Sequence, residues 1–139
     1  MASLVTSAAD APGEGERSPQ RPVVLVVDDS ADMRTLIAEV LTPAGYEVVG
    51  VPSGARALRF MADRIPDVMI TDLFMPGMSG FTLRSTMLRR PDLAHIPVIV
   101  LSAYWHRPAE TLDAVEAIPK PINIDRLLEA VGRLTKAGE

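Results

Sequence analysis

Cysteine is absent from the 139 residues of this sequence. A disulfide framework and a cysteine-based metal or redox site are therefore excluded. No apolar run approaches the roughly 20 residues that a helix needs to cross a bilayer. The first residues also lack the basic start and the apolar core of a secretory signal. We therefore expect a cytoplasmic protein without a membrane partner.

Positive charge is also scarce. Lysine and arginine together number 14 against 18 aspartate and glutamate residues, which gives a formal net charge of -4. The basic surface that nucleic-acid-binding proteins use is missing, so direct binding of nucleic acid is not expected. Hydrophobic residues make up 47% of the chain. A chain of this length and composition predicts one compact domain with a real core.

The first 20 residues differ in texture from the rest. Residues 1–20 are mostly small and polar, with scattered prolines and glycines and almost no large apolar side chains. Such a stretch cannot bury enough surface to offset the entropy lost on ordering it. We predict a disordered tail or linker at residues 1–20 and a single domain at residues 21–139.

From Pro22 onward, short apolar runs alternate with longer amphipathic stretches, which is typical of a parallel sheet covered by helices. The apolar runs predict strands at residues 23–27, 47–51, 68–71, 98–101 and 117–119. Five helices are expected to alternate with them, beginning near Ser30, Ser53, Ser79, Pro108 and Asn123 or Ile124. The pattern predicts a doubly wound α/β sandwich.

The spacing of apolar residues also predicts which side of each helix faces the sheet. The residues expected to point inward are Met33, Leu36, Ile37, Val40 and Leu41 in the first helix, Ala57, Leu58 and Met61 in the second, Leu83, Met87 and Leu88 in the third, and Leu127, Leu128, Val131 and Leu134 in the last. The helix before the last is expected at residues 109–116.

Polar residues follow four of the predicted strands. They are Asp28 and Asp29, then Asp72, then Ser102, then Lys120. In open parallel sheets, ligands bind outside the carboxyl ends of the strands, where the strand order reverses. The sequence therefore predicts that three carboxylates, a hydroxyl and an ammonium group gather at one edge of the sheet.

These five side chains suit phosphoryl transfer. Crowded carboxylates repel one another, and such a cluster persists when a cation neutralises it. Mg²⁺ prefers oxygen ligands and is usually completed by phosphate oxygens. A carboxylate beside Mg²⁺, here Asp72, can attack phosphorus and form an aspartyl phosphate. Ser102 and Lys120 would help to stabilise the charge on the transferred group.

Each of these residues also has an ordinary structural explanation. Asp28 and Asp29 would serve as helix caps, and Asp72 would open a turn. Ser102 would be a loop hydroxyl and Lys120 a solvated surface charge. Their appearance at successive strand ends favours a site over four unrelated structural roles.

Four ordered motifs resemble the receiver domains of two-component response regulators. They are VVLVVDDS from residue 23, TDLFMPGMSG from residue 71, VIVLSA from residue 98 and IPKPI from residue 118. The resemblance covers roughly residue 22 to the end of the chain. It implies a flavodoxin-like three-layer sandwich with a five-stranded parallel sheet in the order 2-1-3-4-5 and five helices.

The resemblance also implies the roles of the site residues. Asp72 would accept a phosphoryl group from phosphohistidine on a sensor histidine kinase or a histidine phosphotransfer protein. Ser102 would donate a hydrogen bond to the phosphoryl group, and Lys120 would pair with it. The bond between Lys120 and Pro121 would be a cis peptide, which is otherwise a minority form of X-Pro bonds.

A Mg²⁺ site belongs to the same resemblance. Asp29, Asp72 and the backbone carbonyl of Phe74 would bind the ion directly, and Asp28 would help through water. Phe74 and Tyr104 also occupy positions two residues beyond Asp72 and Ser102, where family members control the access of hydrolytic water. Two bulky rings there predict slow loss of the phosphoryl group.

One departure concerns how the phosphorylated state is signalled. Receiver domains usually carry an aromatic residue three positions before the lysine, and here that residue is Ala117. Tyr104 or Trp105 would replace the missing ring, or both would simply pack beside the fourth helix. The output is expected to reach a downstream protein through the fourth helix, the fifth strand and the fifth helix.

Two other functions stay open on the sequence. A pseudo-receiver would bind partners constitutively, which Ala117 favours and the complete acidic set opposes. A phosphatase of the haloacid dehalogenase kind would need an acid two positions after its nucleophile, but Phe74 and Ser30 stand at those positions after Asp72 and Asp28. The leading prediction is a switch that catalyses only its own phosphorylation and dephosphorylation and is not a conventional turnover enzyme.

Overall fold

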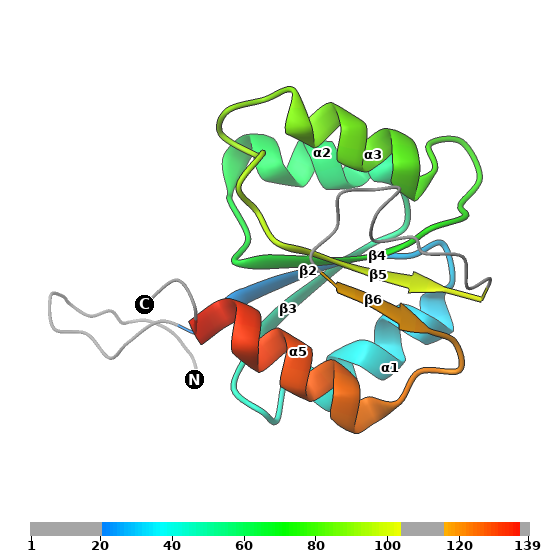
Figure 1. Cartoon of the computed structure of the whole chain (residues 1–139), viewed down its shortest axis with the longest axis vertical. Coiled ribbons are helices and arrows are strands. Elements are labelled where there is room, and N and C mark those ends of the chain that lie inside the picture. Colours follow the sequence, from blue (N-terminus) through cyan, green and yellow to red (C-terminus); the bar gives the residue numbers. More distant parts are fainter. Residues whose placement is uncertain (1–20, 104–115, 137–139) are drawn as a thin grey trace, which may run out of the picture.

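The computed structural model describes residues 21–103 and 116–136, and a parallel sheet lies at its centre (Figure 1). Its strands are β2 (Val23–Val27), β3 (Glu47–Val51), β4 (Val68–Asp72), β5 (Val98–Ser102) and β6 (Glu116–Pro119). Within the described residues they form a five-stranded sheet in the order β3-β2-β4-β5-β6, and every neighbouring pair is parallel. This is the order 2-1-3-4-5 by position along the chain, which confirms the predicted topology.

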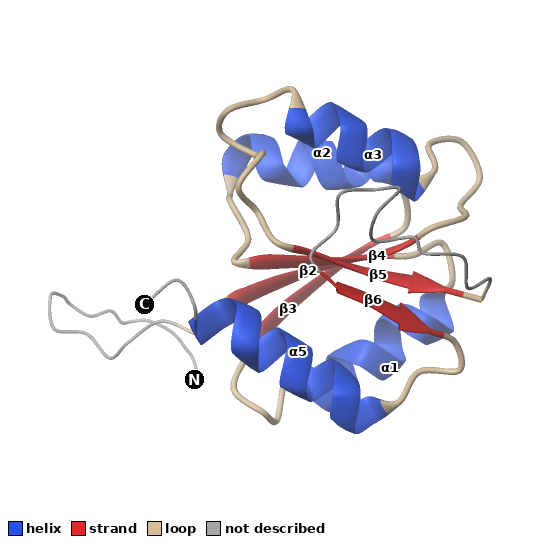
Figure 2. Ribbon diagram, in the orientation of Figure 1, coloured by secondary structure: helices blue, strands red, loops and turns tan. Residues whose placement is uncertain are grey.

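Helices cover both faces of the sheet (Figure 2). The described residues contain α1 (Ala31–Leu41), α2 (Gly54–Asp63), α3 (Gly80–Leu88) and α5 (Ile124–Lys136). The α1 and α5 helices lie on one face, and α2 and α3 lie on the other. In this part of the chain, every helix is too short or too polar to cross a membrane.

The remaining expected helix, at residues 109–116, falls outside the described residues except for Glu116. That residue begins strand β6, where it pairs with Ile99 of β5. Placing Glu116 in a helix was therefore wrong, because the parallel ladder with β5 extends one residue further toward the amino end than the apolar run indicated. The expected tail at residues 1–20 also lies outside the described residues.

Serine side chains begin three of the helices, as the sequence predicts. The hydroxyl oxygens of Ser30, Ser53 and Ser79 each accept a hydrogen bond, 3.2 Å long, from a backbone N–H group three residues later. The side chain of Asn123 accepts in the same way from the N–H group of Arg126 before α5. These bonds satisfy backbone donors that the first turn of a helix leaves without partners.

Two apolar layers hold the helices on the sheet, because alternate residues of each strand face opposite sides. The layer under α2 and α3 includes Leu25, Val27, Met69, Val98 and Val100, with Met61, Leu83 and Met87 from the helices. The layer under α1 and α5 includes Val24, Val26, Ile70, Ile99 and Leu101, with Ile37, Leu127 and Val131 from the helices. The two layers confirm most of the predicted inward positions.

Leu36 and Leu88 are exceptions to the predicted inward faces. Their exposed fractions are 41% and 39%. Leu36 fits the helical spacing but lies at the edge of the inward face of α1, whose buried residues are Ile37 and Leu41. Leu88 is the last residue of α3 and lies one position beyond Met87, which is fully buried. The prediction that both leucines point inward was wrong.

Gly80 allows α3 to begin directly against the strand that ends in Asp72. A Cβ atom at Gly80 would lie 2.7 Å from the backbone oxygen of Asp72 and 3.1 Å from the Cα atom of Leu73. Neither atom can move without shifting β4. Gly54 opens α2 in the same way, but a Cβ atom there would meet the sulfur of Met78 at 2.7 Å, and a methionine side chain adapts readily.

These two glycines give a matched test of the packing. We expect Gly80→Ala to lower the free energy of unfolding by about 1–3 kcal/mol, because overpacking against backbone forces strain. Gly54→Ala should change it by less than about 1 kcal/mol, since the flexible Met78 side chain can move aside. Urea denaturation of both variants measures the difference. Equal effects would contradict the close approach of α3 to β4.

Candidate functional site

Three aspartates meet at the carboxyl ends of adjacent strands. Asp28 and Asp29 follow β2, and Asp72 is the last residue of its neighbour β4. Each of the three offers a carboxylate oxygen, and these oxygens all lie within 4.8 Å of one another. Asp28 is 1% exposed and Asp72 is 8% exposed, while Asp29 faces solvent. The structure brings together the carboxylates that the sequence placed at strand ends.

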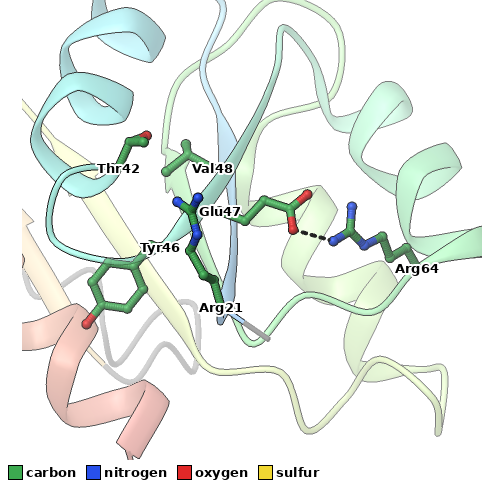
Figure 3. Close-up of a pocket in the computed structure, with 6 residues that line it drawn as sticks. All are labelled: Arg21, Thr42, Tyr46, Glu47, Val48 and Arg64. Atoms are coloured by element: carbon green, nitrogen blue, oxygen red, sulfur yellow. Dashed lines mark hydrogen bonds and ion pairs between the residues drawn. The ribbon is translucent and has the colours of Figure 1, made fainter. Parts of the chain in front are cut away.

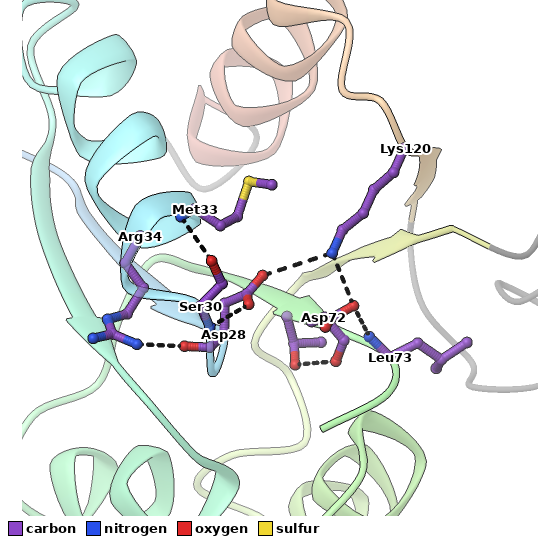
Figure 4. A network of polar contacts seen from close by, with 8 residues as sticks. Asp28, Ser30, Met33, Arg34, Asp72, Leu73 and Lys120 are labelled. Atoms are coloured by element: carbon purple, nitrogen blue, oxygen red, sulfur yellow. Dashed lines mark hydrogen bonds and ion pairs between the residues drawn. The ribbon is translucent and has the colours of Figure 1, made fainter. Parts of the chain in front are cut away.

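Lys120 joins this cluster from the end of β6 (Figure 4). Its Nζ atom lies 3.3 Å from Oδ1 of Asp72 and 3.9 Å from Oδ2 of Asp28. The backbone N–H of Lys120 donates to the carbonyl of Ser102 at 2.9 Å, and the Lys120–Pro121 peptide bond is cis, which is the isomer that the resemblance implies. One ammonium group thus faces two of the three carboxylates.

Backbone donors fix the orientation of two carboxylates. The N–H of Leu73 donates to Oδ1 of Asp72, and the N–H of Ser30 donates to Oδ1 of Asp28, both at 2.9 Å. The buried hydroxyl of Thr71 donates to the carbonyl of Asp72 at 2.9 Å. Asp72 pairs with Leu101 of β5, and the preceding residue Thr71 pairs with Val27 of β2, so neighbouring strands hold this end of β4 on both sides. The site is built on rigid elements, which suits precise positioning.

Burial raises the pKa of the Asp28 carboxyl group above its usual value of 3.8. The negative charges of Asp72 and Asp29 act in the same direction, whereas the Ser30 N–H group and Lys120 oppose it. Oδ2 of Asp28 is buried and has no hydrogen-bond partner among the described residues. A buried charged oxygen without a donor is costly, and this one lies in the cluster of carboxylates.

A divalent cation resolves both features. It would neutralise the repulsion between the three carboxylates and give Oδ2 of Asp28, which lies 3.9 Å from the Lys120 ammonium, a closer positive partner, directly or through water. An all-oxygen set with solvent access on the Asp29 side matches the preference of Mg²⁺, which keeps several waters. The donor chemistry of the cluster therefore fits the ion that the sequence predicted.

Two other expected site residues, Ser102 and Phe74, lie near the acidic cluster in the chain or in the sheet. Ser102 is buried at the end of β5, one residue beyond Leu101, the partner of Asp72 in the sheet. Phe74 is 53% exposed and packs edge to face on Phe81, with ring centroids 6.3 Å apart. Their contacts with a phosphoryl group and with Mg²⁺ stay predictions.

The expected switch residues are only partly described. Tyr104 and Trp105 lie outside the described residues. Ala117 is buried in β6, and its carbonyl oxygen accepts a hydrogen bond of 3.0 Å from the guanidinium group of Arg126 in α5. The sequence analysis missed Arg126 because this bond uses backbone rather than a side chain at position 117.

A pocket of about 550 Å³ lies at the opposite end of the sheet (Figure 3). Arg21, Thr42, Tyr46 and Glu47 are among its lining residues. Arg64 donates to Glu47 at 2.7 Å, and this bond lowers the pKa of the Glu47 carboxyl group. Both side chains are about half exposed, so their ion pair contributes little to the stability of the fold. The pocket shares no residue with the acidic cluster.

Comparison with known proteins identifies the family. The model of the response regulator receiver domain matches residues 24–132. The chain belongs to this family. It is therefore a receiver domain of the kind found in two-component response regulators, and receiver domains bind Mg²⁺ at an acidic pocket such as the one formed here by Asp28, Asp29 and Asp72.

Individual relatives differ widely in their overall length. The sensor histidine kinase TmoS of Ectopseudomonas mendocina is 44% identical over 104 residues, which are 72% of this receiver domain chain and 10% of TmoS. The DNA-binding transcriptional regulator NtrC of Escherichia coli K12 is 33% identical over 118 residues, which are 82% of this chain and 25% of NtrC. The chain thus spans a quarter of NtrC and a tenth of TmoS.

The fold also matches that of a solved structure. The response regulator TrrA of Thermotoga maritima, in complex with Mg²⁺ and BeF, shares 32% identity with this receiver domain. The TM-score is 0.72, and the match covers 81% of this chain and 98% of TrrA. The flavodoxin-like arrangement of sheet and helices is therefore shared with a known receiver.

The raised pKa of Asp28 leads to a prediction for the metal-free protein. Its folded form holds the Asp28 proton more tightly than the unfolded form, so this contribution to stability is full below pH 3.8 and is lost as pH rises through the folded pKa. We expect Asp28→Asn to raise the midpoint of thermal unfolding at pH 7 by a few degrees, with little gain below pH 3.8.

Calorimetry without metal across this pH range measures the effect. Saturating Mg²⁺ should reverse the ranking at pH 7, because a ligand that binds only the folded form stabilises it and the variant loses one carboxylate. A gain from Asp28→Asn that is the same at pH 3 and pH 7 would contradict the assignment.

Proposed function

We propose that this receiver domain is a phosphorylation-dependent switch that accepts a phosphoryl group from phosphohistidine onto Asp72 with Mg²⁺. The supporting observation is the cluster itself. Three carboxylate oxygens lie within 4.8 Å of one another, and the Lys120 ammonium lies 3.3 Å from Oδ1 of Asp72. Helix capping does not explain this convergence, because the N-cap of α1 is Ser30 rather than Asp28 or Asp29.

The proposed reaction forms one bond and breaks another. A carboxylate oxygen of Asp72 attacks phosphorus, the bond between phosphorus and the histidine nitrogen breaks, and the leaving nitrogen keeps the electron pair. Mg²⁺, when bound, would neutralise charge on the phosphoryl oxygens, and Asp29, Asp72, the Phe74 carbonyl and, through water, Asp28 would hold it. The Lys120 ammonium would also stabilise the negative charge on the phosphoryl oxygens.

Lys120 also gives the reaction a structural consequence. In the unphosphorylated protein its ammonium pairs with Asp72 and faces Asp28. A phosphoryl group on Asp72 adds charge and acceptor oxygens, so Lys120 and the Ser102 hydroxyl turn toward it. Ser102 is the last residue of β5 and Lys120 directly follows β6, two strands of the proposed output side. The phosphorylated and unphosphorylated domains would thus favour different packings of the face formed with α5.

The partners follow from the same chemistry. Receiver domains pair with sensor histidine kinases, and the name of TmoS itself is that of a sensor histidine kinase. We therefore infer a sensor histidine kinase or a histidine phosphotransfer protein as phosphoryl donor and a downstream protein as reader, in the cytoplasm. The domain would catalyse only its own phosphorylation and dephosphorylation.

The central experiment is phosphorylation by acetyl phosphate. We expect the wild-type protein with Mg²⁺ to gain one phosphoryl group by intact-mass spectrometry, whereas Asp72→Asn gains none. Asp29→Asn should slow the reaction at least about tenfold, since it removes a metal ligand. Ser85→Ala, on the exposed side of α3, serves as the neutral control.

Other outcomes of that experiment select the alternatives. Absence of both phosphoprotein and beryllofluoride binding in the wild-type protein would favour a pseudo-receiver that binds partners constitutively. Release of phosphate from small phosphoesters over many turnovers would favour the aspartate-nucleophile phosphatase.

A second prediction concerns the lifetime of the phosphorylated state. The exposed ring of Phe74 stands two residues beyond Asp72, where an apolar side chain cannot orient a hydrolytic water. We expect Phe74→Asn to speed the loss of phosphate about tenfold, less than the roughly hundredfold or more of general acid–base catalysis, because an amide can orient a water but does not take its proton. Ile65→Asn replaces a similarly exposed apolar residue that precedes β4 and should leave the rate unchanged. Unchanged hydrolysis in Phe74→Asn would contradict this role.

A further inference from the structure

Arg34 reaches the acidic site from a direction that the proposed reaction does not use. It lies in α1, and its Nη1 atom donates to the backbone carbonyl of Asp28 at 2.7 Å (Figure 4). The contact is partly buried. Its acceptor is a backbone oxygen and not a carboxylate, so Arg34 neither occupies the metal-binding face of Asp28 nor neutralises the cluster directly.

The bonded carbonyl belongs to the peptide unit that joins Asp28 to Asp29. A peptide unit is planar, so holding its oxygen also fixes the N–H and Cα of Asp29. The N–H of Asp28 is held separately by the carbonyl of Val51 at 3.1 Å. The two bonds therefore fasten the chain just before and just after the Asp28 side chain. A charge-assisted hydrogen bond of this kind is stronger and shorter than a neutral one.

Gly50 provides the space that this arrangement needs. It lies in β3, next to Val26 of β2. A Cβ atom at Gly50 would lie 3.2 Å from Cδ of Arg34, 3.4 Å from its Cβ and 3.6 Å from its Cγ. The aliphatic stem of Arg34 thus lies across Gly50, and a larger side chain there would push the guanidinium group away from Asp28.

We propose that Arg34, lying over Gly50, is a positioning residue that presets the Asp28–Asp29 peptide for Mg²⁺ binding. The inference rests on the proposed function, because it concerns the same metal site. Without this bond the N–H of Ser30 would still hold the Asp28 carboxylate. The peptide that leads to Asp29 would lose its fixed orientation, so the Asp29 carboxylate would have to be ordered when the ion binds. Preorganisation of ligands by such outer contacts raises metal affinity.

A purely electrostatic role of Arg34 and the proposed positioning role predict opposite changes in Mg²⁺ affinity. A guanidinium group near a cation site weakens binding by repulsion, so a purely electrostatic role predicts tighter Mg²⁺ binding when the charge is removed. The positioning role predicts weaker binding. Arg34→Met keeps much of the stem without charge or donors, and Arg34→Lys keeps the charge without the planar fork.

The experiment is a titration of the unphosphorylated proteins with MgCl2, followed by amide chemical shifts. We expect Arg34→Met to raise the dissociation constant for Mg²⁺ about tenfold and Arg34→Lys to raise it less. Gly50→Val should also weaken binding in the wild-type background. In the Arg34→Met background, Gly50→Val should have no further effect, because the side chain that it displaces is no longer bonded to Asp28.

Two comparisons separate failure of this inference from failure of the proposed function. Only Asp29→Asn is expected to lack Mg²⁺-dependent chemical shifts. If the wild-type protein also lacks them, the proposed metal site is wrong. If it binds Mg²⁺ and Arg34→Met binds as tightly or more tightly, the positioning role is wrong. Strictly additive effects of the Arg34 and Gly50 changes would also overturn it.

A merely structural role is distinguished by stability. It predicts lower resistance to urea with an unchanged dissociation constant for Mg²⁺, which would contradict the proposal. Should Arg34→Met fail to fold, Arg34→Lys and Gly50→Val carry the same test, since each perturbs the bond to Asp28 and leaves most of the packing in place.

Discussion

Repulsion between carboxylates at one edge of the sheet is the constraint on which the site depends. Asp28 and Asp72 are nearly buried and lie beside Asp29, and the ammonium group of Lys120 balances only part of their charge. The cost appears in the raised pKa of Asp28 and in its orphaned oxygen. The rest of the domain holds these groups together against that repulsion, through the ladders of β2 and β4 and through backbone donors.

The same repulsion gives the proposed switch its physical basis. If the three carboxylates did not repel one another, a cation or a rearrangement of Lys120 would gain little. Because the metal-free cluster carries this repulsion, binding of Mg²⁺ and transfer of a phosphoryl group would each change which contacts of Lys120 are favourable. The response of the proposed switch to Mg²⁺ and to phosphorylation would thus come from the electrostatic repulsion between carboxylates in the folded state.

Much of this arrangement follows from local sequence rules. Short apolar runs predict the strands, and serine caps predict where helices begin, because both signals depend on neighbours within a few residues. The convergence of Asp28, Asp72 and Lys120 also follows, once the strands are parallel. Leu36, Leu88 and Glu116 were misplaced because burial at helix edges and strand ends is decided by tertiary contacts rather than by spacing.

The bond from Arg34 to Asp28 was beyond the reach of the sequence for a related reason. The donor is a side chain and the acceptor is a backbone oxygen. The Arg34 side chain also needs space over β3, which exists because Gly50 has no side chain. The same holds for Arg126, which bonds to the carbonyl of Ala117. Contacts that end on backbone leave no trace in residue type at the acceptor.

The Arg126 contact bears on the missing aromatic of the switch. Glu116, the neighbour of Ala117, pairs with Arg126 at 3.6 Å and also with Arg133. The seam between β6 and α5 is therefore fastened by charged groups around the position where a ring would stand. Lys120 directly follows this short strand. If Lys120 shifts toward a phosphoryl group as proposed, the displacement would reach Glu116 and Ala117 through the backbone of β6, without the side-chain movement of an aromatic switch.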